Sequence, residues 1–319
     1  MKGDNLNNTS LKIPVLIPLI IGIIAISFSS IFVKWSDAPV SVQGMYRLLF
    51  TLIMMLPFVW KQARFLKKIN WRETFLLILS GSFLALHFLF WMGSLKLTTV
   101  ASSTILLSLQ PVFVMIGAYI AFREKTSKAA IIGMMVAILG AIMIGWGDIG
   151  ISTKHIQGDL LSILGTIVVA AHMLIGQKLL KTFPATLYSF SVFLVAVIVF
   201  GIYNLTLDIP MTGYPEKDWG IFLLLAIIPT VFGHVLFNWL LKYVTAATIS
   251  MAILGEPVGA TLLAYMFLDE SLTLSQWSGG AIVLAGLYYF LQNTRKQNKR
   301  TPPAPIKPPV TSGPIVKKG

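Results

Sequence analysis

The chain has 319 residues, of which 56% are hydrophobic and only 12% are charged. A water-soluble protein carries roughly 25% charged residues, so this chain cannot cover itself with polar surface and must use lipid as its solvent. It has no cysteine, which excludes disulfides, thiol chemistry and cysteine-based metal sites.

Ten apolar runs are long enough to cross a bilayer whose hydrocarbon core is about 30 Å thick. They cover residues 13–33, 40–60, 73–94, 98–121, 128–147, 158–179, 185–205, 218–240, 245–267 and 276–291. The first run lacks the Ala-x-Ala-like end of a secretory signal, which indicates an uncleaved helix. We therefore expect an all-α membrane protein with ten transmembrane helices.

The net charge of +13 is placed as in a membrane protein, not as in a nucleic-acid-binding one. If the N-terminus is cytoplasmic, the cytoplasmic segments hold 20 of the 25 Lys and Arg, and the outer loops hold eight of the twelve acidic residues. Such positive-inside bias predicts a multi-pass protein of the cell membrane with both termini in the cytoplasm.

The sequence contains two copies of one unit. A shift of 146 residues aligns Gln110-Pro111 with Glu256-Pro257 and gives 11 identities in the 50 positions from Leu95 to Ile144. Several identities fall on residue types that are scarce here, which indicates a repeat. They include Tyr119 with Tyr265, Glu124 with Glu270, Gly133 with Gly279 and Gly140 with Gly286.

An odd number of crossings in each copy means that the second copy is inverted relative to the first. The charges agree, because the hairpin Arg123-Glu124-Lys125 aligns with Asp269-Glu270-Ser271. We expect an N-terminal cytoplasmic segment (1–12), two five-helix repeats (13–147 and 148–291) and a disordered, basic, proline-rich cytoplasmic tail (292–319).

Glu256 is the only carboxylate in the run 245–267. It lies about eleven residues, or roughly 16 Å of helix, from the start of the run, near the middle of the bilayer. Pro257 cannot donate to the carbonyl of Ile253, so we expect a kink there and an equivalent kink at Pro111.

An intramembrane carboxylate costs about 2.5–3.5 kcal/mol on insertion scales, so Glu256 should face a cavity, meet a cation or hold a proton. It is either a proton or substrate-amine site, or a neutral acid that braces the kink through the carbonyls freed by Pro257.

Other polar and aromatic residues share helix faces. His87 and Trp91 are four residues apart, as are His234 and Asn238, and such faces suit an amphipathic solute. Packing or hydrogen bonds between helices would explain them equally well, and His172 is ambiguous in the same way. The seven candidate binding residues are Glu256, Gln110, His87, Trp91, His234, Asn238 and Arg47, and we expect helices 3, 4, 8 and 9 to line the site.

Arg47 lies about seven residues into the second helix. Either it snorkels to the outer surface or makes a structural pair, or it binds Glu256 or a substrate carboxylate. Gly255 and Gly259 predict close helix packing within the monomer rather than dimerisation. A similar face on the fifth helix, formed by Gly133, Ala137, Gly140 and Ala141, has no partner that the sequence identifies.

Two stretches resemble the paired repeats of the EamA-type family of the drug/metabolite transporter superfamily. They are Leu107 to Phe113 leading to Glu124, and Gly255 to Gly259 leading to Leu268-Asp269-Glu270 and Gly279-Gly280. The resemblance covers about residues 13 to 291 and implies a ten-helix carrier with a central cavity, usually an exporter of small metabolites such as amino acids. Unlike a symmetric carboxylate pair, the first copy carries Gln110 where the second has Glu256.

The chain has no nucleotide-binding Gly-x-x-x-x-Gly-Lys-Ser/Thr loop and no hydrolase motif. We expect a secondary transporter, not an enzyme, that uses no cofactor or metal and exports amino acids or related amines by alternating access. Pro111 and Pro257 would act as hinges, protons are a candidate coupling ion, and membrane lipid is the other partner. The alternatives are a passive pore, or a lipid-modifying enzyme if Glu256 lies beside two histidines. Monomer and homodimer stay open.

Overall fold

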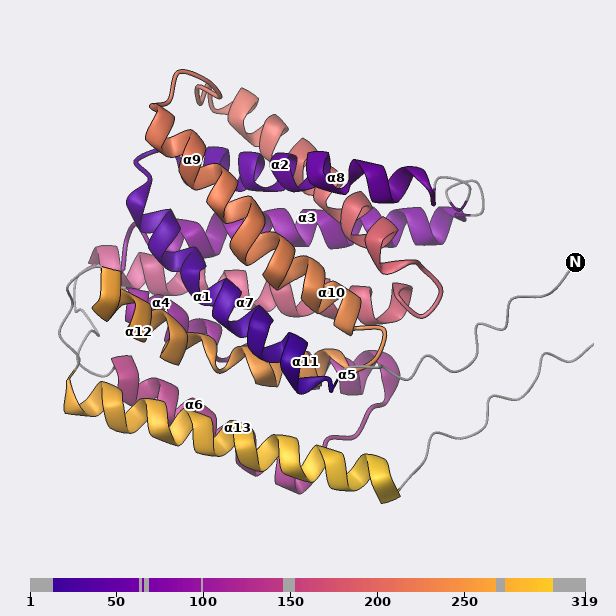
Figure 1. Cartoon of the computed structure of the whole chain (residues 1–319), viewed down its shortest axis with the longest axis vertical. Coiled ribbons are helices and arrows are strands. Elements are labelled where there is room, and N and C mark those ends of the chain that lie inside the picture. Colours follow the sequence, from indigo (N-terminus) through magenta and orange to yellow (C-terminus); the bar gives the residue numbers. More distant parts are fainter. Residues whose placement is uncertain are drawn as a thin grey trace, which may run out of the picture.

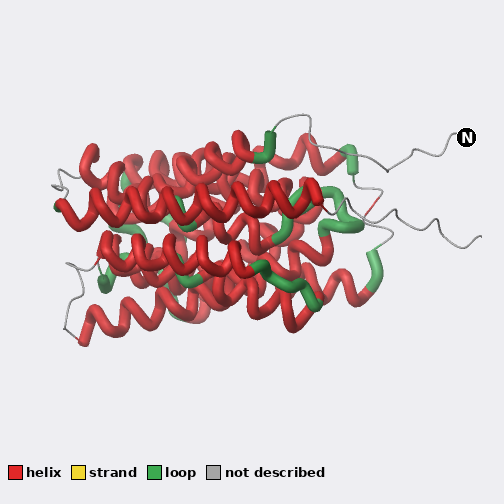
Figure 2. The backbone as a smooth tube through the Cα atoms, turned by 90° about the horizontal axis from the view of Figure 1, so that it is seen from below, coloured by secondary structure: helices red, strands yellow, loops and turns green. Residues whose placement is uncertain are grey.

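The computed structural model describes residues 14–62, 65, 69–98, 100–145, 153–267 and 273–300, without the side chains of 101, 145 and 294–300. These residues form helices joined by short connections, with no strand among them (Figures 1 and 2). The helices are α1 (Leu16–Trp35), α2 (Val40–Trp60), α3 (Trp71–Ser94), α4 (Val100–Leu107), α5 (Gln110–Phe122), α6 (Lys128–Gly145), α7 (Thr153–Leu179), α8 (Ala185–Thr206), α9 (Glu216–Leu225), the π-helix η2 (Ala226–Val235), α10 (Leu236–Leu240), α11 (Ala246–Ile253), α12 (Glu256–Phe267) and α13 (Leu274–Arg300).

The ten predicted crossings are confirmed. Eight helical segments of the described chain are long and apolar enough to span a membrane, and three of these are composite: α4 with α5, α9 with η2 and α10, and α11 with α12. The shorter α6 and the 27-residue α13 lie side by side and complete the ten (Figure 1). Helix α13 continues to Arg300, beyond the expected end of the tenth run at 291, and the rest of the tail lies outside the described residues.

The two repeats run in opposite directions. In Figure 1, α1 starts and α13 ends at the same end of the bundle, whereas α7, the first helix of the second repeat, starts at the other end. Likewise α4 leads into α5 in the direction opposite to that in which α11 leads into α12. The chain is therefore the inverted repeat that the sequence predicts. Asp269, Glu270 and Ser271, which were part of the charge argument, lie outside the described residues.

Burial is distributed as lipid solvation requires. Polar side chains such as Gln43, Arg47 and Gln110 are buried, while Ile24, Ile53 and Ile198 are more than half exposed. In water this arrangement would expose a large apolar surface, but in a bilayer the same side chains meet lipid tails. The interior can therefore hold polar groups that a soluble helical bundle would place outside.

Helix α6 packs closely against α13. The face of small residues on the fifth span, whose partner the sequence does not identify, therefore meets the tenth span. A Cβ on Gly140 would lie 2.6 Å from the nitrogen of Val283 and 2.7 Å from the oxygen of Gly279. The related pair is as close, since a Cβ on Gly286 would lie 2.7 Å from the oxygen of Gly133. Glycine removes the side chain that would separate the two helices.

The Gly-x-x-x-Gly pair of the ninth span packs within the monomer, as predicted. A Cβ on Gly259 would lie 2.8 Å from the Cβ of Ser27, and one on Gly255 would lie 3.2 Å from a methyl group of Ile23. Both contacts are with α1, so the pair brings the broken span of the second repeat against the first helix of the first repeat.

We expect Gly140→Ala to lower thermal stability by about 1–3 kcal/mol, because the new methyl group meets backbone atoms that cannot rotate away. The matched control is Gly201→Ala on α8, where a Cβ meets nothing within 4 Å. There the gain in helix propensity, up to about 1 kcal/mol, should leave stability unchanged or raised. Thermal unfolding of the purified variants measures both. Equal effects would mean that α6 and α13 do not depend on close approach.

Candidate functional site

Two broken helices meet at the centre of the protein. Helix α11 ends at Ile253 and α12 begins at Glu256, just as α4 ends at Leu107 and α5 begins at Gln110. At both breaks the preceding helix tightens, with bonds from Leu254 N to Met251 O at 3.2 Å and from Leu109 N to Leu106 O at 3.2 Å. Such three-residue turns end a helix before a proline, so both predicted interruptions are confirmed.

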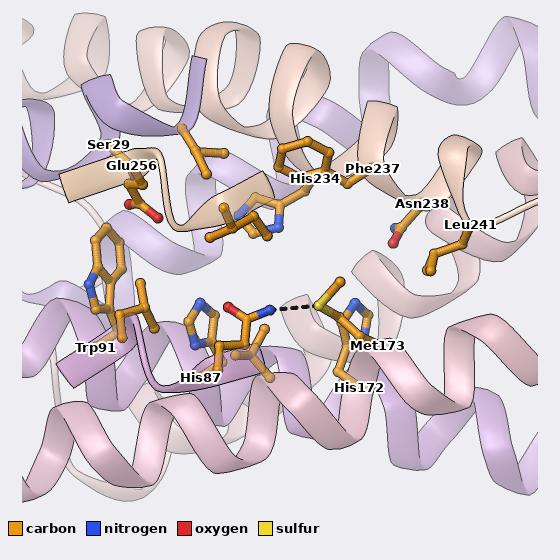
Figure 3. Close-up of a pocket in the computed structure, with 15 residues that line it drawn as sticks. Ser29, His87, Trp91, His172, Met173, His234, Phe237, Asn238, Leu241 and Glu256 are labelled. Carbon is orange, nitrogen blue, oxygen red and sulfur yellow. Dashed lines mark hydrogen bonds between the residues drawn. The ribbon is translucent and has the colours of Figure 1, made fainter. Parts of the chain in front are cut away.

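A cavity lies between the two breaks, and Figure 3 shows the side chains that point into it. About 50 Å³ is open to the centres of water molecules, which is room for a few waters. The lining residues are Ile26, Ser29, His87, Trp91, Leu107, Gln110, Val169, His172, Met173, His234, Phe237, Asn238, Leu241, Ile253 and Glu256.

Six of the seven predicted binding residues therefore come together: Glu256, Gln110, His87, Trp91, His234 and Asn238. The set of lining helices is wider than predicted. The four predicted spans, which are α3, α4–α5, α9–η2–α10 and α11–α12, do line the cavity. Helices α1 and α7, the first of each repeat, line it as well, through Ile26, Ser29, Val169, His172 and Met173. The repeat could have shown this, because Ile26 and His172 are 146 residues apart.

The cavity lies on the axis that relates the repeats. Four pairs of lining residues are separated by the repeat length of 146 residues: Ile26 and His172, Trp91 and Phe237, Leu107 and Ile253, and Gln110 and Glu256. Both copies therefore offer equivalent positions to a bound solute, but with different side chains.

Glu256 is 5% exposed, and its carboxyl group opens into the cavity opposite Trp91 (Figure 3). Within the described residues the carboxyl group makes no hydrogen bond and no ion pair, whereas the backbone oxygen of Glu256 accepts from Ser27 Oγ at 3.5 Å. A brace formed by this side chain to the carbonyls freed by Pro257 is thus absent from this conformation. The carboxyl group is available to a solute or a proton.

Three histidines surround the same space and are held by different contacts. His87 Nδ1 donates to the oxygen of Gly165 at 3.0 Å, and its ring stacks on Trp91 with 6.1 Å between centroids. His172 Nδ1 lies 3.1 Å from the oxygen of Ser80. His234 packs edge-on against Phe88. Because Nδ1 of His87 and of His172 is engaged by backbone, Nε2 is the nitrogen that each can offer to a ligand.

Further bonds fix the polar wall. Ser80 Oγ links His172 Nδ1, at 2.9 Å, to Tyr188 Oη, at 2.8 Å. Gln110 Nε2 donates to the sulfur of Met173 at 2.7 Å, drawn as the dashed line in Figure 3. Asn238 Nδ2 donates to Ser189 Oγ at 3.1 Å.

Arg47 is the exception among the predicted residues. The expectation that it snorkels is wrong, since Arg47 is 0% exposed, and it does not line the cavity. Its Nη1 donates to Ser29 Oγ at 3.3 Å, and its guanidinium carbon lies 4.2 Å from the ring centroid of Phe88. It makes no ion pair with Glu256. Arg47 therefore lies behind the cavity wall, and Ser29, to which it is bonded, lies between it and the cavity.

The π-helix in the eighth span explains how Arg47 is held. Pro229 has no N–H for the oxygen of Leu225, and Thr230 Oγ1 donates to that oxygen at 2.8 Å instead. The same hydroxyl accepts from Arg47 Nε at 3.0 Å. One side chain thus satisfies both a carbonyl freed by proline and a buried cation. Sequence reasoning missed this residue because nothing but the fold brings Arg47 to it.

We expect Thr230→Val to lower stability by about 1–3 kcal/mol, because it leaves Arg47 Nε without a partner in the interior. Thr206→Val on α8 is the control, since the hydroxyl of Thr206 is exposed and water can replace its bond. Thermal unfolding compares the two variants. A loss at Thr206 as large as that at Thr230 would contradict the assigned role.

The EamA-like transporter family matches residues 13–146 and 156–292 of the chain. An uncharacterized transporter of Archaeoglobus fulgidus is 28% identical over 70% of this chain and 79% of its own. The transporter YwfM of Bacillus subtilis is 26% identical over 80% and 85%. A WAT1-related protein of Arabidopsis thaliana is 24% identical over 90% and 89%.

A solved crystal structure has the same fold, with a TM-score of 0.74 at 13% identity, and the match covers 89% of this chain and 98% of the other. The family match spans both repeats and the breaks that bound the cavity. The chain belongs to the EamA-like transporter family, and it is a multi-pass membrane transporter.

Proposed function

We propose that the chain exports small amphipathic metabolites, amino acids or related amines, across the cell membrane by alternating access. The observation that carries this proposal is the cavity between two inverted repeats, at the point where a helix of each is broken. Secondary carriers with inverted repeats bind solutes near the bilayer midplane at such breaks.

The lining favours a solute with a cationic head and an apolar body. Glu256 supplies a carboxyl group without a protein partner, and the indole of Trp91 faces it, so an ammonium group between them would gain an ion pair and a cation–π contact. Leu107, Val169 and Leu241 supply apolar wall for the rest of the solute. No Lys or Arg lines the cavity to repel a cation.

Bonds tie the repeats together at both ends of the bundle. At one end Ser36 Oγ of the first repeat donates to Asp218 of the second at 2.6 Å. At the other, Gln177 Nε2 donates to Glu124 at 2.8 Å. In the proposed cycle, one of these two sets of contacts opens at a time to admit or release the solute.

The shared cavity also bears on the lipid-modifying alternative. Glu256 and three histidines line one space, but within the described residues no hydrogen bond joins the carboxyl group to an imidazole. A relay in which an imidazole orients or activates the carboxyl group would need such a contact, at about 2.6–3.2 Å or through one water molecule. The geometry therefore favours transport over chemistry.

We expect Glu256→Gln to fold normally but to lose pH-gradient-driven transport in vesicles, because the amide can neither carry a proton nor neutralise an amine. A panel of radiolabelled amino acids and amines, tested for efflux from expressing cells, identifies the solute. The control is Glu216→Gln, at an exposed carboxyl group on α9. Full pH dependence in Glu256→Gln would remove the proton role.

Counterflow in the same vesicles separates a carrier from a passive pore. A carrier accumulates labelled solute transiently when unlabelled solute is loaded inside, whereas a pore equilibrates without an overshoot. A lipid-modifying enzyme would instead change the lipid composition of the vesicles.

The orientation with both termini in the cytoplasm is part of the proposal and can be tested directly, because the chain has no native cysteine. We expect Lys125→Cys, between α5 and α6, to react with impermeant maleimide only from the cytoplasmic side. Asp208→Cys, between α8 and α9 at the opposite end of the bundle, should react only from outside (Figure 1). The reverse pattern would invert the direction assigned to transport.

A further inference from the structure

A second, larger space opens between helices on the outside of the bundle. Its walls are α1, the broken span α11–α12, and α13, and it encloses about 670 Å³. Apart from Thr248, Tyr288 and Gln292 its lining side chains are aliphatic or glycine. We call it the α1–α13 groove. It is distinct from the central cavity, with which it shares no lining residue.

Two of the three walls of the groove have the length of one leaflet. On α1 its wall runs from Val15 to Ile24, and on α13 from Leu284 to Gln292. At 1.5 Å per residue these walls are roughly 12–14 Å long, close to half of a hydrocarbon core about 30 Å thick. The third wall begins at Val244 and passes the helix break to reach Leu262.

The groove opens at the end of the bundle that carries both termini. Helices α1 and α11 start and α13 ends at that end (Figure 1), and the lining there includes Val15, Val244 and the polar side chain of Gln292. Helix α13 continues beyond Gln292 to Arg300, and its sequence there contains Arg295, Lys296, Lys299 and Arg300 without an acidic residue. Basic residues at the membrane surface attract anionic lipid headgroups by about 1 kcal/mol each.

The deep end of the groove reaches the break in the ninth span. Ala252 and Gly255 line the groove, while their neighbours Ile253 and Glu256 line the central cavity. On α1, Ile23 faces the groove and Ile26 the cavity. One layer of helix therefore separates the two spaces.

We propose that the α1–α13 groove binds an anionic phospholipid of the leaflet on the side of the termini, with one acyl chain along its walls and its headgroup at the basic end of α13. The apolar lining fits an acyl chain, the walls on α1 and α13 match one leaflet, and the basic sequence with which α13 ends suits an anionic headgroup. The end of the chain rests against the break that carries Glu256.

A transmembrane helix from a second copy of the chain fits the groove less well. Such a helix would need a seam of about 30 Å across the whole bilayer. Only the wall on the ninth span, from Val244 to Leu262, approaches that length, whereas the walls on α1 and α13 extend for half of it.

The test is the phospholipid retained by the purified protein in detergent, counted by phosphorus assay and identified by mass spectrometry. The full chain should keep about one phosphatidylglycerol per protein. Ile20→Trp, which places a larger ring in the groove at a position 45% exposed, should lose most of it. The matched control is Ile198→Trp on α8, 51% exposed and outside the groove, which should retain the wild-type amount.

Equal retention in all three proteins would overturn the proposal, as would a dimer that Ile20→Trp converts to monomer. If Ile20→Trp does not fold, Leu284→Trp on the facing wall replaces it. As a second measurement, phosphatidylglycerol added to lipid-depleted protein should raise the thermal midpoint by several degrees, while glycerol phosphate, the headgroup alone, should not. A rise with the headgroup alone would place binding at the surface and refute the groove. These readouts do not depend on transport.

Discussion

The structure depends on one constraint: in hydrocarbon, a backbone interruption is stable only where it is buried in protein or faces a polar cavity. Pro111 and Pro257 each impose such an interruption near the middle of a span. The two breaks must therefore turn inward, and inversion of the repeats brings them face to face. The central cavity, and the exposure of Glu256 and Gln110 to it, follow from this requirement.

The two repeats place their backbones symmetrically around the cavity but line it with different side chains. Positions related by the repeat line the cavity in pairs, which suits two units that exchange conformations. The side chains in those pairs differ: a carboxyl group at Glu256 against an amide at Gln110, and an imidazole at His172 against an alkyl chain at Ile26. A solute between Glu256 and Trp91 would thus contact both repeats but meet a different chemical group from each.

The sequence predicts the spans, the inverted repeat, both interruptions and six cavity residues, because each depends on local pattern or on the alignment of the copies. It could not predict the place of Arg47. Helical position suggests an exposed end, whereas the side chain is buried by Ser29, Phe88 and Thr230, which come from three other helices. The partner of the fifth helix was hidden for the same reason, since glycines show that something approaches closely but not what.

Because a single layer of α1 and α11 separates the central cavity from the groove, the two spaces cannot change independently. Ile253 and Glu256 face one side of this layer, and Ala252 and Gly255 face the other. Any movement of the break that widens the cavity for a solute displaces the groove wall by a similar distance. An acyl chain packed there would resist or favour that movement, and in the proposed transport cycle the lipid composition of the leaflet would then shift the equilibrium between conformations.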